Sequence, residues 1–211
     1  MSKLGALIAV LDFTGVAVDE FNDWYDTEHI PERLRVPGFL SAQRWLAANG
    51  KPLSIVLYDL EELGVLASAT YRAIAGANFS PWSKRVIGVC PRFWRYEAEQ
   101  ILPGDQVSPA AAGGLLFYAM NVEPGAEEEF NRWYDSEHIP RLAAVPGVLA
   151  ARRYRSAAGD HKYLAVYHLE SPAVAKSQEF AAAADTEWSR RILPKTSDPL
   201  RFLCTPYART R

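Results

Sequence analysis

The chain lacks the features that mark several large classes of protein. None of its 211 residues belongs to a run of 18 or more apolar residues, the length that a membrane-spanning helix needs. The formal net charge is −2 and no basic stripe is present, which argues against a nucleic-acid partner. The first residues show no small-residue cleavage pattern of a secretion signal. We therefore expect a cytoplasmic protein that binds neither membranes nor nucleic acids.

The motifs of common metal and cofactor sites are also missing. The two cysteines, Cys90 and Cys204, make no disulfide framework, and we expect each to be a small buried residue. Neither His-x-x-x-His nor Cys-x-x-Cys occurs in the sequence. The pair Gly113-Gly114 precedes a predicted strand rather than a helix, so it is not a phosphate-binding loop. The sequence thus predicts no metal and no cofactor.

What the chain does contain is a repeat. Shifted by 109 residues, residues 21–45 align with residues 130–154 without a gap, and 15 of these 25 positions are identical. Ordinary composition would give roughly one or two identities by chance. A second block that begins at Trp82 matches the block at Trp188 after a slip of three residues. The identical pairs include Trp24/Trp133, Tyr25/Tyr134, Asp26/Asp135, Glu28/Glu137, His29/His138, Pro31/Pro140 and Arg44/Arg153.

The repeat divides the chain into two halves. Residues 1–98 form the first half and residues 113–211 the second, and the segment 99–112 between them is a linker rich in Pro, Gly and Ala. Two copies are too few for a solenoid, so the repeat indicates a fused dimer. Apolar residues make up 49% of the chain, enough for each half to contribute to a packed core.

Each half predicts the same order of elements. The order is a buried strand, a helix that ends at a proline, a hairpin of two strands, an Ala-rich helix, a turn with a Trp-Ser motif, and a last strand. In the first half these elements are residues 6–13, 19–30, 39–46, 54–60, 62–77 and 89–96. In the second half they are residues 115–122, 126–139, 148–155, 163–169, 172–184 and 200–207. This βαββαβ order is that of the ferredoxin-like unit, and we expect the two α+β halves to pack sheet to sheet around a pseudo-twofold axis.

The repeated segment carries a family resemblance. The pattern Phe-Asn-x-Trp-Tyr-Asp-x-Glu-His-Ile-Pro, followed by Val-Pro-Gly and a strand, resembles the dimeric α+β barrel superfamily. Within that superfamily it is similar to the ethyl tert-butyl ether degradation (EthD-like) branch. The resemblance covers both halves and implies a dimeric α+β barrel. It also implies one of several activities: cofactor-free monooxygenase, lactone isomerase, polyketide cyclase or haem-binding enzyme, although the sequence shows no axial ligand for a haem.

The resemblance also bears on assembly. Most members of the superfamily build the barrel from two separate chains. Both halves lie in one chain here, so a monomer meets the requirement for a closed barrel, and a further homodimer stays open.

The repeated helix places a carboxylate and a histidine near its apolar face. At 100° per residue, Phe21, Trp24 and Tyr25 form the apolar stripe, with Glu28 in its middle and His29 at its edge. A carboxylate that faces a core needs a partner, because burying it unpaired is costly.

Two arginines are candidate partners of Glu28. Arg44 shares a strand face with Leu40 and Ala42, and Arg85 follows the second helix. The counterparts of Glu28 and its two partners in the second half are Glu137, Arg153 and Arg191. Glu28 is then either one member of a structural Glu–Arg pair or a carboxylate in a ligand pocket.

His29 and His138 are the leading candidates for chemistry, because histidine titrates near neutrality and serves as a general acid or base. Tyr25 lies one turn earlier on the same face as His29 and predicts a hydrogen-bond partner for a substrate, as does Tyr134 in the second half. Asp26 is a candidate for fixing the imidazole tautomer. The alternative is that each histidine caps the end of its helix. Since both copies keep the motif, either both halves are active or these residues hold the fold.

The other two histidines have no histidine counterpart. His161 aligns with Pro52, and His168 aligns with Asp59. We interpret His168 as ordinary packing or a surface residue. If the halves differ in function, the pair of positions 59 and 168 is where we expect the difference.

Two functional hypotheses remain. The first is a small-molecule enzyme of the EthD-like type that acts on a cyclic or aromatic compound as an isomerase, cyclase, dehydratase or cofactor-free monooxygenase. The second is a non-catalytic ligand-binding or accessory protein with the same fold, in which the repeated motif is structural. In the first hypothesis the catalytic residues are His29, His138, Tyr25 and Tyr134. Its substrate-binding residues are Trp24, Trp133, Glu28, Glu137, Arg44 and Arg153.

Overall fold

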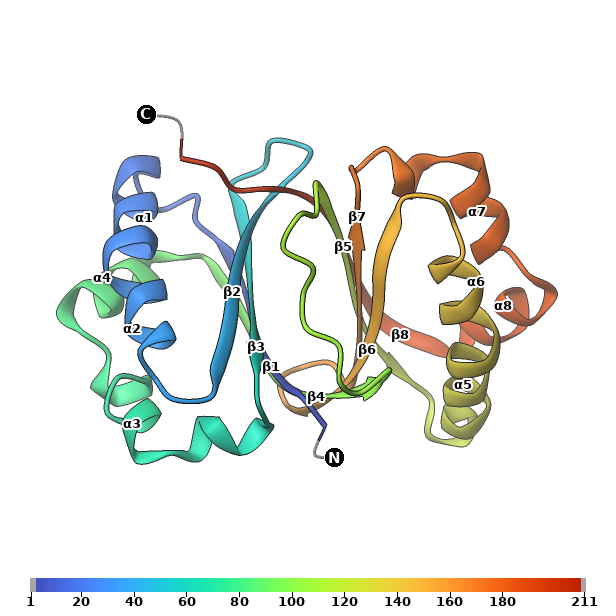
Figure 1. The fold of residues 1–211 in the computed structure, drawn as a ribbon, viewed down its shortest axis with the longest axis horizontal. Helices are drawn as coiled ribbons and strands as arrows, with labels where there is room; N and C mark the ends of the chain where they lie inside the picture. The colour runs from blue at the N-terminus through green and yellow to red at the C-terminus, as the bar shows by residue number, and fades with distance from the viewer. Residues whose placement is uncertain (1–2, 210–211) are drawn as a thin grey trace.

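Eight antiparallel strands close into one barrel in the computed structural model, which describes residues 3–209 (Figure 1). Around the barrel the strands follow the order β1-β3-β2-β8-β5-β7-β6-β4, and β4 pairs with β1 again. The strands are β1 (Gly5–Asp12), β2 (Phe39–Ala47), β3 (Leu53–Leu60), β4 (Arg92–Leu102), β5 (Gly114–Val122), β6 (Val148–Ala158), β7 (Tyr163–Leu169) and β8 (Thr196–Pro206).

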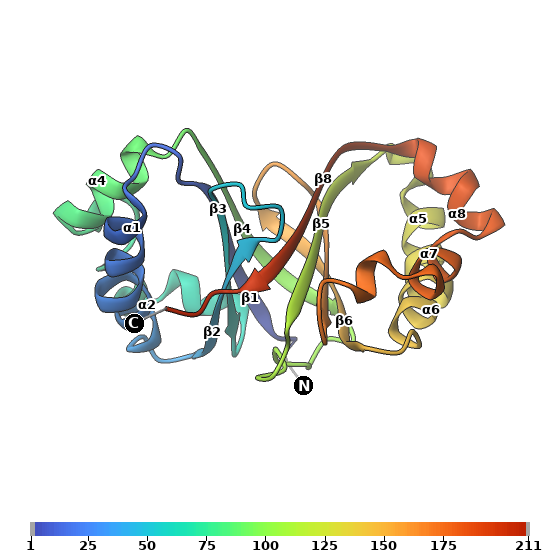
Figure 2. The ribbon, with the colours of Figure 1, turned by 90° about the horizontal axis from the view of Figure 1, so that it is seen from above.

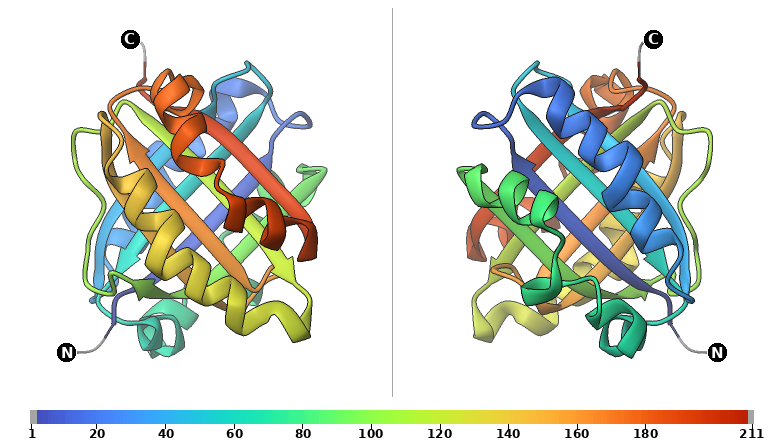
Figure 3. Two further views of the ribbon diagram at one scale, coloured as in Figure 1. Left: turned by 90° about the vertical axis from the view of Figure 1, so that its right-hand side faces the viewer. Right: turned by 90° about the vertical axis from the view of Figure 1, so that its left-hand side faces the viewer.

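Helices lie on the outside of the barrel in two groups, one on each flank (Figures 2 and 3). The first group is α1 (Val18–Trp24), α2 (Ile30–Leu34), α3 (Ala69–Arg72) and α4 (Pro81–Val89). The second group is α5 (Glu127–Trp133), α6 (Ile139–Ala143), α7 (Gln178–Ala184) and α8 (Glu187–Ile192). The predicted order of strands and helical segments thus occurs twice. None of the helices within residues 3–209 has the length and apolar character to cross a membrane.

Three apolar cores hold this arrangement. One fills the inside of the barrel and contains Ile8 and Val10 with Phe117 of the other half. The other two lie between the sheet and each group of helices. Strand β1 shows why its sequence is almost continuously apolar: Ile8 and Val10 face the barrel interior, whereas Leu7 and Leu11 face the helices. Both faces of the strand are therefore buried.

The barrel closes where the edges of two four-stranded sheets meet. Strand β2 pairs with β8 through Trp45–Ala47, and β4 pairs with β6 through residues 97–102. The two sheets therefore join at their edges as well as packing their inner faces. Closure removes the free edges that an isolated half would expose to other chains.

The first helix continues past the proline that was expected to end it. Tyr25–His29 form a π-helical turn, in which the Ile30 N–H donates to the carbonyl of Tyr25 five residues earlier. The helix then runs on through Pro31 to Leu34 as α2. In a regular α-helix the proline ring clashes with the carbonyl four residues earlier, and the wider turn relieves that clash. The second half repeats this geometry at Tyr134–His138 and α6.

The predicted Ala-rich helix is wrong in the first half. Residues 62–77 form a 3-10 turn (Leu63–Ala67) and only one α-helical turn, α3. Ser68 caps α3 by accepting a hydrogen bond from the Tyr71 N–H, so the chain restarts a helix there instead of continuing one. The expected Trp-Ser turn is a helix, α4, whose first turn is capped by Ser80. In the second half Thr186 caps α8 in the same way.

The last strand of each half is longer than predicted and has a different register. Arg95 lies opposite Ala9 on β1, whereas Arg201 lies opposite Tyr118 on β5. Ala9 and Tyr118 are 109 residues apart, so the counterpart of Arg95 is Arg201, at a spacing of 106 residues. The three-residue slip seen at Trp82 therefore persists to the end of each half.

A glycine in the repeated Val-Pro-Gly turn is required by the backbone. Gly38 has a φ of +94° and its counterpart Gly147 a φ of +86°, which favours glycine over residues with a side chain. A Cβ on Gly38 would also lie 2.4 Å from the Cγ2 of Val65. A bulge follows in β2 between Phe39 and Ser41. It breaks the predicted alternation, so Leu40 is exposed rather than on the helix-facing side with Arg44.

A buried polar cluster lies where the two sheets meet. The Arg152 Nη1 donates to Asp59 Oδ1 at 2.7 Å, and both side chains are almost fully buried. Next to this ion pair, His168 Nε2 donates to Gln43 Oε1 at 2.9 Å. Positions 43 and 152 correspond in the repeat, as do 59 and 168. The cluster is thus one pair of positions used twice, once as a charged pair and once as a neutral pair.

The linker covers this cluster and passes between β2 and β6 (Figure 1). The Ser108 N–H donates to Asp59 Oδ2 at 2.7 Å, and Arg152 donates to the Gln106 carbonyl at 3.1 Å. Gln43 Nε2 donates to the carbonyl of Pro109 at 2.8 Å. The segment between the halves is therefore part of the junction. His168 is fully buried here rather than at the surface.

Removing one member of the buried ion pair should destabilise the protein. We expect Arg152→Met to lower the free energy of unfolding by about 3–5 kcal/mol, because Asp59 would remain buried without its cation. The double variant Asp59→Asn/Arg152→Met should recover most of this loss. Urea unfolding followed by circular dichroism measures both.

The exposed pair of Arg190 and Asp185 is the matched control for this test. Arg190→Met should leave the unfolding midpoint nearly unchanged, because that ion pair lies in solvent. Equal effects of Arg152→Met and Arg190→Met would contradict a structural role for the buried pair.

Candidate functional site

His29 lies under the sheet-facing side of the first helix. Its ring stacks against Trp24, with ring centroids 4.2 Å apart, and meets Tyr25 edge-on at 5.4 Å. The side chain is 8% exposed. The π-helical turn explains this position, since a turn of five residues rotates each residue after Tyr25 relative to a regular helix. His29 therefore moves from the edge of the apolar stripe into the core.

Glu28 turns toward α4 and away from the predicted arginines. It accepts hydrogen bonds from Ser80 Oγ at 2.5 Å and from Ser83 Oγ at 3.3 Å. Ser83 also accepts from Trp24 Nε1 at 3.0 Å and lies 3.4 Å from Nδ1 of His29. Glu28 thus ties the first helix to the capped start of α4. The expected Glu28–Arg44 or Glu28–Arg85 pair is wrong, because the π-helical turn rotates Glu28 out of the stripe.

The second half repeats this network. Glu137 accepts from Thr186 Oγ1 at 2.5 Å, and Trp133 Nε1 donates to Ser189 Oγ at 3.2 Å. Glu28 and Glu137 are half-buried and do not line the space in front of the histidines.

Arg44 supports the tyrosine of the motif from behind. Its guanidinium lies 4.6 Å from the centre of the Tyr25 ring and donates to Asn22 Oδ1 at 2.6 Å. Arg153 is placed alike, 4.3 Å from the Tyr134 ring and 2.9 Å from Asn131 Oδ1. Neither arginine lines a pocket with a histidine. Both act on the tyrosine rings through cation–π contact.

Asp26 does not reach His29, contrary to one expectation. It accepts a hydrogen bond from the Tyr207 hydroxyl at 2.8 Å and one from Arg209 at 3.2 Å. Both residues belong to the C-terminal segment that follows β8. The end of the second half therefore lies on the helix that carries His29. Arg85 binds Glu20 at the surface and is equally remote from the motif.

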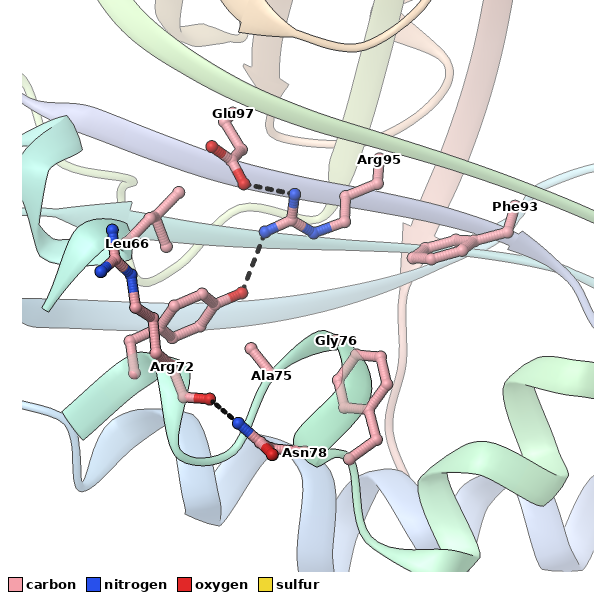
Figure 4. Close-up of a pocket in the computed structure, with 10 residues that line it drawn as sticks. Leu66, Arg72, Ala75, Gly76, Asn78, Phe93, Arg95 and Glu97 are labelled. Carbon is pink, nitrogen blue, oxygen red and sulfur yellow. Dashed lines mark hydrogen bonds and ion pairs between the residues drawn. The ribbon is translucent and has the colours of Figure 1, made fainter. Parts of the chain in front are cut away.

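An open pocket leads toward His29 from the outside. It has a volume of about 610 Å³ and lies between β4 and the segment from Leu66 to Phe79. Figure 4 shows Arg95 and Glu97 on one wall, across from Arg72 and Asn78. A deeper recess of about 20 Å³ continues from it and is lined by Trp24, Tyr25 and His29. The pocket and the recess share Tyr71, Phe79, Phe93 and Arg95.

Two tyrosines place hydroxyl groups at this recess. Tyr58 lines it together with Tyr25, and the Tyr58 hydroxyl is buried without a hydrogen-bond partner among the described residues. Burial raises the pKa of both phenols, so both stay protonated donors. An unpaired buried hydroxyl is costly, and here it faces a space that a ligand oxygen can enter. The sequence analysis missed Tyr58, although the Tyr-x-Leu-Glu segment there recurs at Tyr167.

His29 is a neutral base in this environment. Burial, and secondly the positive charge of Arg33, holds the pKa of its imidazole well below the usual value. The guanidinium of Arg33 is itself buried and donates to the backbone carbonyl of His29 at 3.2 Å. A neutral imidazole with a free nitrogen accepts a proton, and tyrosine hydroxyls stabilise the oxyanion that forms when a carbon next to a carbonyl loses one.

The second half contains a related but different pocket. A space of about 130 Å³ is lined by His138, Tyr134 and Trp133. The Nδ1 of His138 is buried without a partner among residues 3–209, and burial lowers the pKa of His138 to about 4. Tyr118 and Leu142 line this pocket at the positions of Ala9 and Arg33. The histidine is thus retained while its surroundings change.

The two histidine pockets do not suit a metal or a haem. Within residues 3–209 no group of three or more His, Cys, Asp or Glu side chains is arranged to hold a metal ion. His29 and His138 face spaces of about 20 and 130 Å³ between helix and sheet. These spaces are too small for a porphyrin, so no step below involves one.

Burial of neutral histidines should make the protein sensitive to acid. The folded-state pKa of His29 is well below 6.5, that of His138 is about 4 and that of His168 about 3. Below pH 6.5 the unfolded chain therefore binds more protons than the folded one, and stability falls as the pH falls. Between pH 6.5 and 5 each histidine contributes a slope of up to about 1.4 kcal/mol per pH unit.

Unfolding by urea at several pH values measures this slope. We expect His138→Gln to remove roughly one histidine's share of it. An unchanged slope in this variant would show that His138 is not buried in its neutral form.

Comparison with known proteins places the fold. No family model matches the chain, and no curated protein is similar to it. Among solved structures, an anthrone oxidase-like protein is similar at a TM-score of 0.66 and 12% identity, over 98% of this chain and 92% of that one. A monooxygenase-like protein from Listeria innocua gives 0.57 at 8% identity, over 99% and 96% of the two chains. A chlorite dismutase from Candidatus Nitrospira defluvii gives 0.54 at 10% identity, over 98% and 92%. The chain therefore has the fold of the ferredoxin-like dimeric α+β barrel proteins.

Proposed function

We propose that the protein is an enzyme that transfers a proton to or from a small cyclic or aromatic organic compound at His29. Its reaction is an isomerisation, cyclisation, dehydration or cofactor-free oxidation, which share proton abstraction next to a carbonyl or phenol. It is an EthD-like protein in which two barrel halves, residues 1–98 and 113–211, are fused through the linker. His138 is the corresponding group of the second half.

The observation that carries this proposal is the recess at His29. A buried neutral imidazole, two protonated tyrosine hydroxyls and an open pocket meet there. The pocket walls are mainly apolar and aromatic, through Leu66, Phe79 and Phe93, as small-molecule sites commonly are. A general base, a donor for the oxyanion and an apolar wall are the parts that enolisation needs.

Each residue of the recess has a role in this proposal. His29 takes the proton from carbon. Tyr58, whose hydroxyl lacks a partner among the described residues, and Tyr25 donate to the oxygen that becomes negative. Trp24 holds the imidazole by stacking, and the Glu28–Ser83 network fixes the helix relative to α4. Glu28 and Arg44 act through neighbours rather than on the substrate, which revises the substrate-binding roles expected for them and for Glu137 and Arg153.

The structural neighbours are compatible with this class of reaction. Two of them are named as an anthrone oxidase-like and a monooxygenase-like protein. At 12% identity or less they indicate only the fold, and function depends on the site. We use them solely to choose a probe, a fused-ring ketone with an acidic C–H.

The alternative is a ligand-binding protein without catalysis. One observation favours it: Ser83 connects Trp24, Glu28 and His29 in a network that is complete without any ligand. The motif would then be conserved between the halves because it joins helix to helix. The experiment below separates the two functions, because it measures chemistry and binding in the same sample.

Hydrogen–deuterium exchange tests proton transfer directly. In D₂O we expect the protein to accelerate exchange at the carbon next to the carbonyl of 2-tetralone, followed by NMR. His29→Gln should reduce this acceleration by about 10²–10⁴-fold, the usual contribution of a general base. Glutamine is preferred to alanine because it fills the space beside Trp24.

His138→Gln is the matched variant and reports what the second half contributes. Circular dichroism checks that both variants fold. Binding of 2-tetralone without accelerated exchange would support the alternative function. Acceleration that survives in both variants would contradict proton transfer by these histidines.

A further inference from the structure

The two histidine pockets differ in charge. Arg33 and Arg95 line the recess at His29, and Arg72 lines the pocket in front of it. The residues that line the pocket at His138 include no arginine or lysine among those that the structure describes. Leu142 stands where the first half has Arg33. The repeated motif is therefore set in two different electrostatic environments.

A single strand position explains most of this difference. Ala9 lies opposite Arg95, and its small side chain leaves the guanidinium at the neck between the pocket and the recess. At the corresponding place Tyr118 lies opposite Arg201. Its hydroxyl accepts a hydrogen bond from Arg201 Nε at 2.8 Å, and Arg201 is exposed. In the second half the tyrosine thus fills the neck and holds the arginine outside.

Arg95 is oriented by its neighbours but not enclosed by them. Its Nη2 donates to the Tyr71 hydroxyl at 3.0 Å, and its Nη1 donates to Glu97 at 2.5 Å. About 31% of the side chain remains exposed, toward the pocket that Figure 4 shows. Glu97 offsets one positive charge, and Arg72 on the facing wall adds a second. The pocket as a whole keeps a positive charge.

We propose that only the first half binds an anion, and that its ligand is a planar aromatic compound with a phenolate, enolate or carboxylate oxygen held by Arg95. This inference rests on the site proposed above and adds the charge of the ligand and the number of sites per chain. A planar guanidinium matches such oxygens with two donors. Tyr71 lies beside Arg95, while Phe79 and Phe93 contact the ring.

The size of the recess sets how the ligand lies. A space of about 20 Å³ takes roughly one water-sized group, whereas the pocket of about 610 Å³ takes a fused-ring system. The body of the ligand therefore stays between β4 and the segment around Phe79. Only one small group at its edge reaches His29, while the anionic oxygen remains at the neck.

Calorimetric titration with two probes tests this proposal. We expect 1-hydroxy-2-naphthoate to bind with a stoichiometry of one per chain. Arg95→Gln should weaken its binding about tenfold or more, the value of a lost charge-assisted hydrogen bond. The neutral probe 1-naphthol should bind wild type and Arg95→Gln within about twofold of each other. Arg201→Gln, the matched arginine of the second half, should change neither probe.

A second variant copies the closed neck into the first half. In Ala9→Tyr the new hydroxyl should bind Arg95 as Tyr118 binds Arg201, and naphthoate binding should be lost. Two equal naphthoate sites in wild type would overturn the proposal. So would equal weakening of both probes in Arg95→Gln, an effect of Arg201→Gln as large as that of Arg95→Gln, or no binding of naphthoate at millimolar concentration.

Failure of this inference is distinguishable from failure of the proposed reaction. Binding of naphthoate should persist in His29→Gln, because Arg95 and the aromatic walls are unchanged in that variant. An anion site with no accelerated exchange of 2-tetralone would leave the binding inference intact and remove catalysis. Accelerated exchange without preference for the naphthoate would do the reverse.

Discussion

Closure of the barrel is the constraint on which the other features depend. A four-stranded sheet with helices on one face leaves the second face and two edges exposed, and both must be covered. Here β2 meets β8, β4 meets β6, and one apolar core fills the interior between the halves. Side chains already occupy that interior. Space for a ligand therefore arises only outside the barrel, between each sheet and its own helices, where the two halves are free to differ.

The π-helical turn is the second organising feature. It lets the helix pass through Pro31, turns Glu28 toward the start of α4 and moves His29 into the core. The same residues at regular helical spacing would bury a carboxylate and leave the histidine at the rim. One inserted residue per turn thus decides which of two adjacent ionisable groups faces the ligand.

These two features also separate what sequence could predict from what it could not. The repeat, the alternation of strands and helices, and the choice of His29 and Tyr25 follow from patterns that do not depend on exact geometry. The partner of Glu28 could not be predicted, because a helical wheel assumes 100° per residue and the π-helical turn breaks that spacing. Arg95 and Tyr58 escaped notice for a different reason. They lie on strands whose relation to His29 is set by register, and the three-residue slip hides that Arg95 and Arg201 correspond.

The buried cluster at the junction has a consequence for how the halves choose each other. Two copies of the first half would set Gln43 against Asp59 at both junctions and bury two carboxylates without a cation. Two copies of the second half would set Arg152 against His168 twice and bury two guanidinium groups without an anion. Only the mixed pairing neutralises the charge. The halves have become obligate and unlike partners, so an ancestor able to self-pair can no longer be regained by cutting the linker.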